Sequence, residues 1–524
     1  MAYTASTNAV GTLFDNESTR IEEILSKQID TILPTLDPIW RDTVVSAQGV
    51  GPVSEFSKDF QVNKLYRTGM TGVIEQGGPA SDFMLYGDDV NSVSSGSRIL
   101  RQNTTSVFPD PMDGPKPKTF RLTVPMRAMY TNLSLTLGEL QMDATPAVIG
   151  DVVSPILQGF AQNLSHTLCN YWYLSQNDSY RLGTVDSTVA NEDSLEGSGS
   201  TTGTAGSVKS VTFKTDELAG DRFFTGQRVD FYSGNTRRNG ADGARKAAYV
   251  ASVDDLTGLI RVVTPDGLDT VVADGDIVVY ANSGEISDGS AGTPSFTGIA
   301  GVNSWLKASG NLLGGEAATD TAARIDVDVH PEFKSFTKTS VGVLTEHKLR
   351  QYLRRFHVAK MKYGQTIDSL VASDGVWLSY EAQKIGQYQI ERGGNLSNLN
   401  SQGSEEGFAF TFEGRTYKGH TSNYVEKETV YGWKTSGNNW KRYVPPDYAG
   451  LQNMPEADAY VPFRFVVPAL TGGSSVKFPY LLGNGKGMTE AVQMPGMLRM
   501  QLIPDQPAGL KLTGVTEDRV YADD

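Results

Sequence analysis

The amino-acid sequence predicts an α+β protein in which a small β-unit is inserted into a mixed host fold. Apolar residues recur at helical spacing over 145–175, which indicates one long helix. Strand-like segments follow within 181–295, enclosed by Gly- and Ser-rich linkers. Mixed helical and strand-like patterns return after them. A β-unit between two such linkers is typical of a domain added at a tolerant loop.

Charge and composition limit the classes of partner. The 524 residues suffice for about two to four domains. With 46 Lys and Arg against 60 Asp and Glu, the net charge is −14, so contact with nucleic acid requires a local basic patch. The single cysteine, Cys169, excludes an intramolecular disulfide and indicates assembly inside a cell. The N-terminus lacks a signal pattern and no apolar run is long enough for a bilayer, so we expect a soluble protein without a membrane partner.

The N-terminal region predicts a polar arm followed by short helices. Residues 1–16 are polar and without periodicity, and an amphipathic helix is expected from Glu17. Pro34 is expected to end that helix. Asp37 and Pro38 then offer an N-cap and a first-turn proline for a second short helix through Trp40.

Residues 50–118 have no sustained periodicity and close with the proline-rich run PDPMDGPKPKTF. So long a loop is uncommon inside a compact domain. It fits an arm whose binding surface lies on another subunit. The run FRLTVPMRAMYTNL at 120–133 predicts a strand region.

The long helix at 145–175 has Thr145 as a candidate cap and Pro146 in its first turn. Pro155 should kink or interrupt it near Asp151, because the ring clashes with a carbonyl one turn back. The apolar face consists of Ile149, Val152, Val153, Ile156, Phe160, Leu164, Leu168 and Trp172.

The β-unit is expected to begin after a flexible linker, STVANEDSLEGSGSTTGTAGS, and to end before a second linker, NSGEISDGSAGTPS. A barrel-like or sandwich-like arrangement is expected. Its strands are predicted near 208–213, 227–232, 247–253, 258–263 and 276–280.

The segment after the β-unit predicts alternating strands and helices. A strand is expected at IDVDVH (325–330), a helix from Leu344 to about Lys362, and a strand, turn and helix over 369–384. Further strands are predicted at FAFTFEGRTYKG, TVYGWK, WKRYVPP, FRFVVPAL and MPGMLRMQLIP.

Motifs of catalysis and cofactor binding are missing from the sequence. It contains no HExxH, GxSxG, GxxxxGKS/T or CxxC pattern, and GNGKGMT at 483–489 lacks the upstream glycine of a phosphate loop. Five His and one Cys offer little for metal or nucleophile chemistry. We therefore expect no enzymatic activity, no catalytic residue, no cofactor and no metal.

Three acidic and imidazole groups, Asp326, Asp328 and His330, would share one face of a strand and could hold a hard metal ion. The simpler interpretation, which we prefer, is a solvent-facing strand with alternating polar residues. His166 and Cys169 lie three positions apart on the long helix and are interpreted as packing residues, since no third group accompanies them.

A basic stretch, HKLRQYLRRFHVAKMK, stands out at 347–362. Arg350, Arg354 and His357 are expected to share one face, which would contact DNA, face a neighbouring subunit or remain solvated. The buried stripe of the same helix would be Leu349, Leu353 and Phe356. A second basic group is interpreted as an ordinary charged loop, with a receptor or glycan contact as the alternative: Arg237, Arg238, Arg245 and Lys246.

The order of these parts, together with several later segments, resembles the major capsid proteins of tailed bacteriophages, which have the Hong Kong 97 fold. The similar segments are LTEHKLRQYL, GQTIDSLVASDGVWLSYEAQ, FEGRTYKG, NNWKRYVPP and MPGMLRMQLIPDQPAGLKL. The resemblance covers most of the chain except about 181–295, and its motifs are structural rather than catalytic.

The resemblance implies an N-terminal arm at 1–55, an E-loop at 56–120, and a P-domain strand and spine helix at 121–180. The β-domain at 181–295 would be inserted, and 296–524 would complete the P-domain and the A-domain. Copies would form hexamers and pentamers of an icosahedral head around double-stranded DNA. Portal, scaffolding and decoration proteins would be further partners. The protein would be assembled in the host cytoplasm and located in the virion.

Contacts between subunits are expected in the E-loop, with Phe83 and Tyr86 as apolar anchors and Arg98 and Arg101 as charge partners. Three other interpretations stay open at this point. They are an encapsulin-like cellular shell, a β-rich glycan-binding protein or hydrolase, and another virion component such as a tail or portal subunit.

Overall fold

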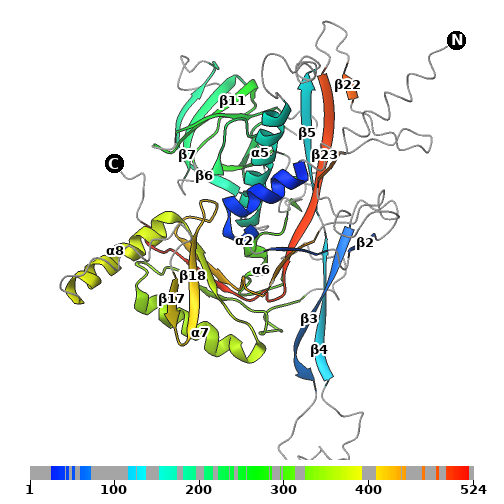
Figure 1. Ribbon diagram of the computed structural model, residues 1–524. Helices are drawn as coiled ribbons and strands as arrows, with labels where there is room; N and C mark the ends of the chain where they lie inside the picture. Colours follow the sequence, from blue (N-terminus) through cyan, green and yellow to red (C-terminus); the bar gives the residue numbers. More distant parts are fainter. Residues whose placement is uncertain are drawn as a thin grey trace, which may run out of the picture.

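The computed structural model is shown in Figure 1. It describes residues 25–41, 43–46, 50–52, 60–71, 116–125, 127–136, 153–173, 181–195, 206–215, 222–234, 236–240, 246–254, 257–281, 284–285, 295–296, 299–312, 325–391, 409–437, 439–443, 463–465, 480–482 and 491–517.

A seven-stranded antiparallel sheet takes all of its strands from residues 181–280, which we call the β-module. Phe213 lies edge-on to Phe231, with 5.6 Å between ring centroids, in the core of this module. The predicted strands are confirmed within a few residues. In spatial order they are β10 (Tyr249–Asp254), β11 (Leu259–Leu268), β7 (Val208–Thr215), β6 (Arg181–Glu192), β12 (Ile277–Tyr280), β8 (Val229–Ser233) and β9 (Thr236–Arg237).

Strand β6 corrects the sequence prediction, which places residues 187–192 in a flexible linker. The strand lies in the middle of the sheet, pairing with β12 through its first residues and with β7 through its later ones. Its polar side chains have distant partners. Thr188 donates to Asp274 Oδ1 over 3.1 Å, and Asn191 Nδ2 donates to the Val272 carbonyl over 3.1 Å. Strand pairing and these bonds outweigh the local composition.

A mixed six-stranded sheet lies on the other side of the central core. Helices α7 (Glu346–Lys360) and α8 (Asp374–Glu391) cover one of its faces. Successive residues of one strand face opposite ways: Leu370 and Ala372 pack with the two helices, whereas Val371 packs into the central core. Its strands, in order, are β15 (Phe336–Lys338), β24 (Leu510–Thr513), β19 (Thr429–Trp433), β16 (Ser369–Ala372), β18 (Arg415–Thr421) and β17 (Ala409–Phe412).

A third sheet is built around the long strand β23 (Ala491–Pro504). The strands that pair with β23 are all antiparallel to it: β5 (Arg127–Thr136), β20 (Trp440–Tyr443), β21 (Phe463–Phe465) and β22 (Tyr480–Leu482). Strand β1 (Val44–Ser46) extends the sheet by pairing in parallel with β20. The predicted strand region at 120–133 is therefore divided between two sheets, since its first half belongs to a separate hairpin.

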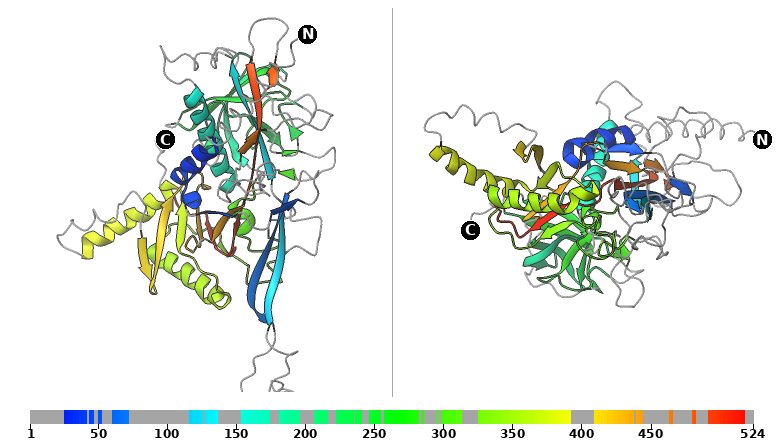
Figure 2. Two further views of the ribbon diagram at one scale, coloured as in Figure 1. Left: turned by 45° about the vertical axis from the view of Figure 1, so that its right-hand side comes forward. Right: turned by 90° about the horizontal axis from the view of Figure 1, so that it is seen from below.

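That hairpin consists of β3 (Phe60–Thr71) and β4 (Lys116–Pro125), with β2 (Val50–Pro52) along its edge. Figures 1 and 2 show it extending away from the rest of the described chain. Its base is fixed by Tyr66, whose hydroxyl donates to the Pro504 carbonyl over 2.8 Å, and by the ion pair of Lys64 with Asp505. Leu65, next in the strand, is 59% exposed.

Helix α5 (Val153–Tyr173) lies between the central core and the core of the β-module. Leu168 and Trp172 pack into the central core, whereas Tyr171 packs into the core of the β-module. Pro155 lies within the first turn of the described helix, where the missing N–H costs no intrahelical bond. Thr145, Pro146 and the kink expected near Asp151 lie outside the described residues.

The N-terminal part of the described chain is helical over 25–36, so the prediction that Pro34 ends this helix is wrong. Leu25, Ile29 and Leu33 are completely buried in the central core, and their burial outweighs the cost of the proline. The predicted cap is confirmed: Asp37 Oδ1 accepts a bond from the Ile39 amide over 2.9 Å at the start of α2 (Pro38–Arg41).

Four of the tryptophans form the centre of the molecule. Trp172 lies 6.1 Å from Trp40 and 5.2 Å from Trp440, and Trp440 lies 6.1 Å from Trp433, all between ring centroids in edge-to-face arrangements. They come from α2, α5, β19 and β20, so these elements share one interior. Edge-to-face pairs add about 0.5–1.5 kcal/mol each beyond the area they bury.

Candidate functional site

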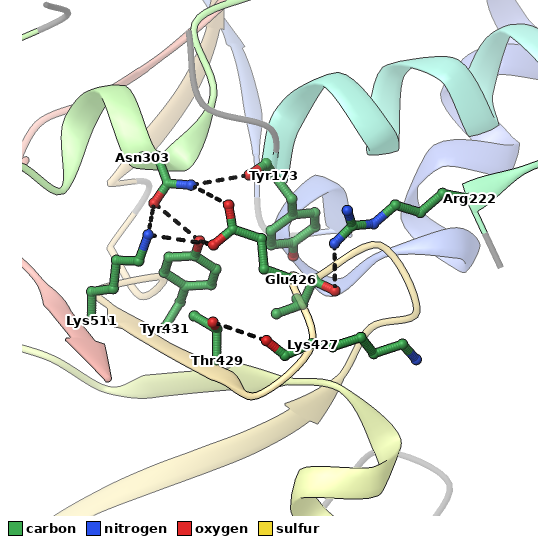
Figure 3. Close-up of polar contacts among 9 residues, drawn as sticks. Tyr173, Arg222, Asn303, Glu426, Lys427, Thr429, Tyr431 and Lys511 are labelled. Carbon is green, nitrogen blue, oxygen red and sulfur yellow. Dashed lines mark hydrogen bonds and ion pairs between the residues drawn. The ribbon is translucent and has the colours of Figure 1, made fainter. Parts of the chain in front are cut away.

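The best-defined polar cluster of the described chain surrounds Glu426, between the mixed sheet and α5 (Figure 3). Asn303 Nδ2 donates to Glu426 Oε1 over 2.9 Å, and Lys511 Nζ lies 3.4 Å from Oε2. The Tyr431 hydroxyl lies 2.9 Å from Oε2 and 3.0 Å from Asn303 Oδ1. Lys511 also donates to Asn303 Oδ1 over 2.7 Å. The carboxylate thus has a cation and two neutral donors around it.

The protonation of this cluster follows from its surroundings. Burial would raise the pKa of Glu426, but the cations Lys511 and Arg222 and the bond from Tyr431 outweigh burial, and the pKa is lowered. Burial and the adjacent carboxylate raise the pKa of Tyr431 well above its usual value. Glu426 is therefore an anion and Tyr431 a neutral donor at neutral pH.

Arg222 joins this cluster to the β-module. It is buried and donates to the carbonyl oxygens of Val425 over 3.1 Å and Leu182 over 3.3 Å. Its own carbonyl accepts from Asn170 Nδ2 over 3.1 Å, and the same amide donates to the Tyr280 hydroxyl over 2.7 Å. One arginine thereby connects the module, α5 and the loop that precedes β19.

Asp37 forms a second buried polar junction. Its carboxylate accepts bonds from the Tyr173 hydroxyl over 2.9 Å, from the Ile39 amide and from the Ser422 hydroxyl. Burial raises the pKa of Asp37 to about 6, against the opposing effect of these bonds. The residue ties α2 to α5 and to the segment after β18. Sequence patterns gave no signal for either junction, since the partners are separated by long stretches of chain.

Asp326, Asp328 and His330 do not lie on a strand, so the predicted strand at 325–330 is wrong. Only Asp326 makes a bridge, to Asn311, and a turn follows. Asp326 Oδ1 accepts from the Asp328 amide over 2.9 Å, which closes the turn. Asp328 accepts from Lys334 Nζ over 2.7 Å and from the Gly310 amide. Within the described ranges, no three His, Cys, Asp or Glu side chains are arranged to hold a metal ion.

The basic helix is confirmed as α7, capped by Thr345, with Leu349, Leu353 and Phe356 buried. Its exposed face holds Arg350 and Arg354, but His357 does not share it, and that prediction is wrong. His357 is buried between the Tyr417 hydroxyl and Arg415, whose Nη1 lies 2.8 Å from Nδ1. Burial and the arginine lower the pKa of His357 to about 4, so it is neutral at neutral pH.

The charged loop of the β-module is paired with acids of the same module. Arg238 makes two bonds to Asp276, of 3.0 and 2.9 Å. Arg237 lies 3.9 Å from Asp230, and Lys246 lies 2.7 Å from Asp269. Arg245 lies outside the described residues. These pairs favour the interpretation as an ordinary charged surface.

His166 and Cys169 lie one turn apart on α5 and both contact the central core, His166 through Tyr424. The ring of His166 is a hydrogen-bond partner of the Tyr424 hydroxyl, and burial lowers its pKa. Burial raises the pKa of the Cys169 thiol well above its usual value, so the thiolate is suppressed. Both behave as packing residues.

The predicted contact residues Phe83, Tyr86, Arg98 and Arg101 lie outside the described residues, as does the glycine-rich segment 483–489. Among the helices that the structure describes, none is both long enough and apolar enough to span a bilayer.

Comparisons with known proteins give structural similarities only. No family model matches the sequence, and no curated protein matches it. A cyanophage A-1(L) capsid chain is 8% identical with a TM-score of 0.36, and 90% of each chain is covered. A chain of the satellite phage P4 procapsid is 7% identical with a TM-score of 0.31, covering 98% of each chain. An encapsulin of Synechococcus elongatus is 12% identical with a TM-score of 0.20, over 36% of this chain and 55% of the encapsulin. The chain is thus similar over most of its length to phage capsid structures, at TM-scores too low to establish a shared fold.

Proposed function

We propose that this chain is the structural subunit of a phage head. Copies assemble as hexamers and pentamers of an icosahedral shell around double-stranded DNA, and the subunit has no enzymatic activity. Assembly takes place in the host cytoplasm, the mature location is the virion, and portal, scaffolding and decoration proteins are further partners.

In this proposal the chain has the Hong Kong 97 fold with an added β-domain. Residues 1–55 are the N-terminal arm, 56–120 the E-loop, and 121–180 the P-domain strand and spine helix. Residues 181–295 are the insertion, and 296–524 complete the P-domain and the A-domain. Arg350 and Arg354 are retained as a face toward DNA or a neighbouring subunit.

The observation that carries the proposal is the β3–β4 hairpin. The inner part of the hairpin already packs on its own chain: Val62, Leu122 and Val124 are buried in the central core, and Tyr66 and Lys64 bond to Pro504 and Asp505. Beyond this part the strands extend away from the body, Leu65 is 59% exposed, and such a ribbon needs a further surface to pack against. Such an element gains stability by lying on another copy, and repetition over a symmetric shell multiplies the gain.

The overall charge suits a DNA container. A net charge of −14 repels a polyanion, so the shell does not bind tightly to the DNA it encloses. Purified protein should therefore bind double-stranded DNA only weakly, and tight binding would count against this part of the proposal.

The test is sedimentation of the purified full chain, followed by negative-stain microscopy of the fastest-sedimenting fraction, repeated with co-expressed head genes. We expect closed shells or discrete hexamers and pentamers. A monomer under both conditions would contradict the proposal. Shells containing protein cargo and no DNA would instead support the encapsulin-like alternative.

A variant separates assembly from folding. Replacing Phe83, Tyr86, Arg98 and Arg101 together with Ala should abolish shells and leave folded subunits. The matched control replaces an exposed leucine, two exposed cations and a half-buried tyrosine of the β-module with Ala: Leu195, Lys209, Arg228 and Tyr249. Normal shells from the first variant would show that these four residues do not form the contact between subunits.

A further inference from the structure

Two neighbouring helices, α7 and α8, present outer faces of opposite charge. Both cover the same face of the mixed sheet, so the sides turned away from it are exposed. Figure 1 shows both helices at the outer side of the molecule, away from the β-module. Their inner sides are fully accounted for by packing, through Leu353 and Phe356 of α7 and Val376 and Trp377 of α8.

The outer face of α7 is cationic at one end and apolar at the other. Arg354 and Val358 lie four positions apart on one side of α7. Met361 is the first residue of the 3-10 helix η4 (Met361–Tyr363) that follows, and its amide still donates to the His357 carbonyl, so it continues the same side. Val358 is 76% exposed and Met361 54%, which are high values for large apolar side chains. Arg355 and Lys362 flank them and are exposed as well.

The outer face of α8 has the same spacing and the opposite charge. Asp374, Leu378 and Glu381 follow at positions i, i+4 and i+7 and are exposed, Leu378 to 44%. The apolar residue lies between two carboxylates.

The two stripes match best when the helices run antiparallel. In that register Arg354 meets Glu381, Val358 meets Leu378, and Lys362 meets Asp374. In the parallel register Arg354 would meet Asp374 and Val358 would again meet Leu378, but Lys362 would face Ala382, so one of the two ion pairs is lost. Within its own chain Arg354 lies 3.5 Å from Glu413, an exposed ion pair that contributes little in water. Each stripe is roughly 10 Å long at 1.5 Å per residue, and two helices pack at about 8–10 Å, so the pairing fits ordinary helix packing.

We propose that the outer face of α7 docks antiparallel on the outer face of α8 of a second copy of this chain. The inference rests on the proposed self-assembly and names one of its contacts. A second copy is favoured over DNA because Val358 and Met361 lie inside the cationic face. A phosphate backbone would leave these apolar groups unmatched, whereas Leu378 covers them.

Disulfide trapping in the full chain tests the contact. The Val358→Cys chain is mixed with the Leu378→Cys chain, oxidised, and analysed on a non-reducing gel. Cys169 is buried and stays in both. We expect a covalent dimer in the mixture and none in either chain alone. The matched control replaces Leu378→Cys with Leu195→Cys, since Leu195 is also 44% exposed. No dimer in the mixture, or an equal dimer with the control, overturns the proposal.

Charge reversal tests the energetic coupling. Arg354→Glu and Glu381→Arg should each raise the half-assembly concentration about tenfold, and the double variant should return it toward the wild-type value. Additive effects of the two changes overturn the contact. So does a result in which Arg354→Glu weakens retention on double-stranded DNA and leaves assembly unchanged, because the face would then bind nucleic acid.

The outcomes for the contact and for the proposed function can be distinguished. If the protein forms only small oligomers but the dimer is trapped, the helix contact is supported and the capsid function is contradicted. If closed shells form but no dimer is trapped, the capsid function is supported and the helix contact is contradicted.

Discussion

Arg222 donates a hydrogen bond from Nη2 to the carbonyl oxygen of Val425 over 3.1 Å, although 203 positions separate the two residues. The arginine belongs to the β-module and the carbonyl to the loop before β19. Because the guanidinium also bonds to the Leu182 carbonyl within the module, the same side chain fixes both parts. The module is therefore anchored to the rest of the chain by buried polar contacts as well as by α5.

Removal of this anchor should destabilise the whole subunit. Arg222→Ala leaves the carbonyls of Leu182 and Val425 without this donor, and we expect a loss of about 2–4 kcal/mol in the free energy of unfolding. Denaturant unfolding followed by circular dichroism gives the value. Arg228→Ala, an exposed arginine of the same module, serves as control and should change it by less than about 0.5 kcal/mol. Equal effects of the two changes would show that Arg222 is not an anchor.

Asp37 should give the subunit a stability that falls as the pH rises from about 4 to about 6. Its pKa is about 6 in the fold and 3.8 in the unfolded chain, so the folded state binds the proton more tightly. The stabilisation is complete below the pKa of the unfolded chain and is lost as the pH rises through the pKa of the folded protein. At ~1.4 kcal/mol per pKa unit, the fall is about 3 kcal/mol.

The substitution Asp37→Asn removes this titration while keeping an oxygen acceptor for Ile39 and Tyr173. Between about pH 4 and pH 6 the unfolding free energy of the wild type should therefore fall by about 3 kcal/mol more than that of the variant. Parallel pH profiles of the two proteins would rule out a titration of Asp37 in this range.

Leu65 should affect assembly and not folding. The side chain is 59% exposed on the hairpin, so Leu65→Ser should change the unfolding free energy by no more than about 0.5 kcal/mol. If the hairpin lies on a neighbouring copy, the same change should reduce the yield of shells in sedimentation. Leu195→Ser provides the control on the β-module. Full assembly of the Leu65 variant would place this side chain outside the contact.

Replacing either of two glycines with alanine should change the stability of the subunit in opposite directions. A Cβ on Gly509 would meet the Gly432 carbonyl oxygen and lie 2.6 Å from Leu306 Cδ2, so backbone would have to move. We expect Gly509→Ala to cost about 1–3 kcal/mol as overpacking. A Cβ on Gly159, within α5, meets nothing within 4 Å, so Gly159→Ala should stabilise by up to ~1 kcal/mol. Thermal unfolding of the pair measures both, and a stabilised Gly509→Ala would contradict the packing at that point.

The elements with their own periodicity could be predicted from the sequence. The strands of the β-module and the buried stripe of α7 follow from alternation and helical spacing. Strand β6 could not be predicted, because its polar residues, such as Thr188 and Asn191, are typical of a linker. Their partners, Asp274 and Val272, lie more than 80 residues away in the sequence. Local composition carries no information about such partners.

The candidate sites depended even more on distant chain segments. His357 follows Phe356 directly, and only Tyr417 and Arg415 of β18 decide that its ring is buried. The alternation of IDVDVH is the same in a turn closed by Asp326 as in a strand. Glu426 and Lys511 belong to different strands and loops, so their pairing had no sequence signal.

Tyr171 and Trp172 are neighbours on α5 that pack into different interiors. A β-unit transplanted from another protein could replace residues 181–280 only if it covered Tyr171 and supplied a donor where Arg222 now stands. A short peptide grafted into a surface turn of the existing module has no such requirement. The module is therefore better suited to displaying foreign sequences than to being exchanged as a whole.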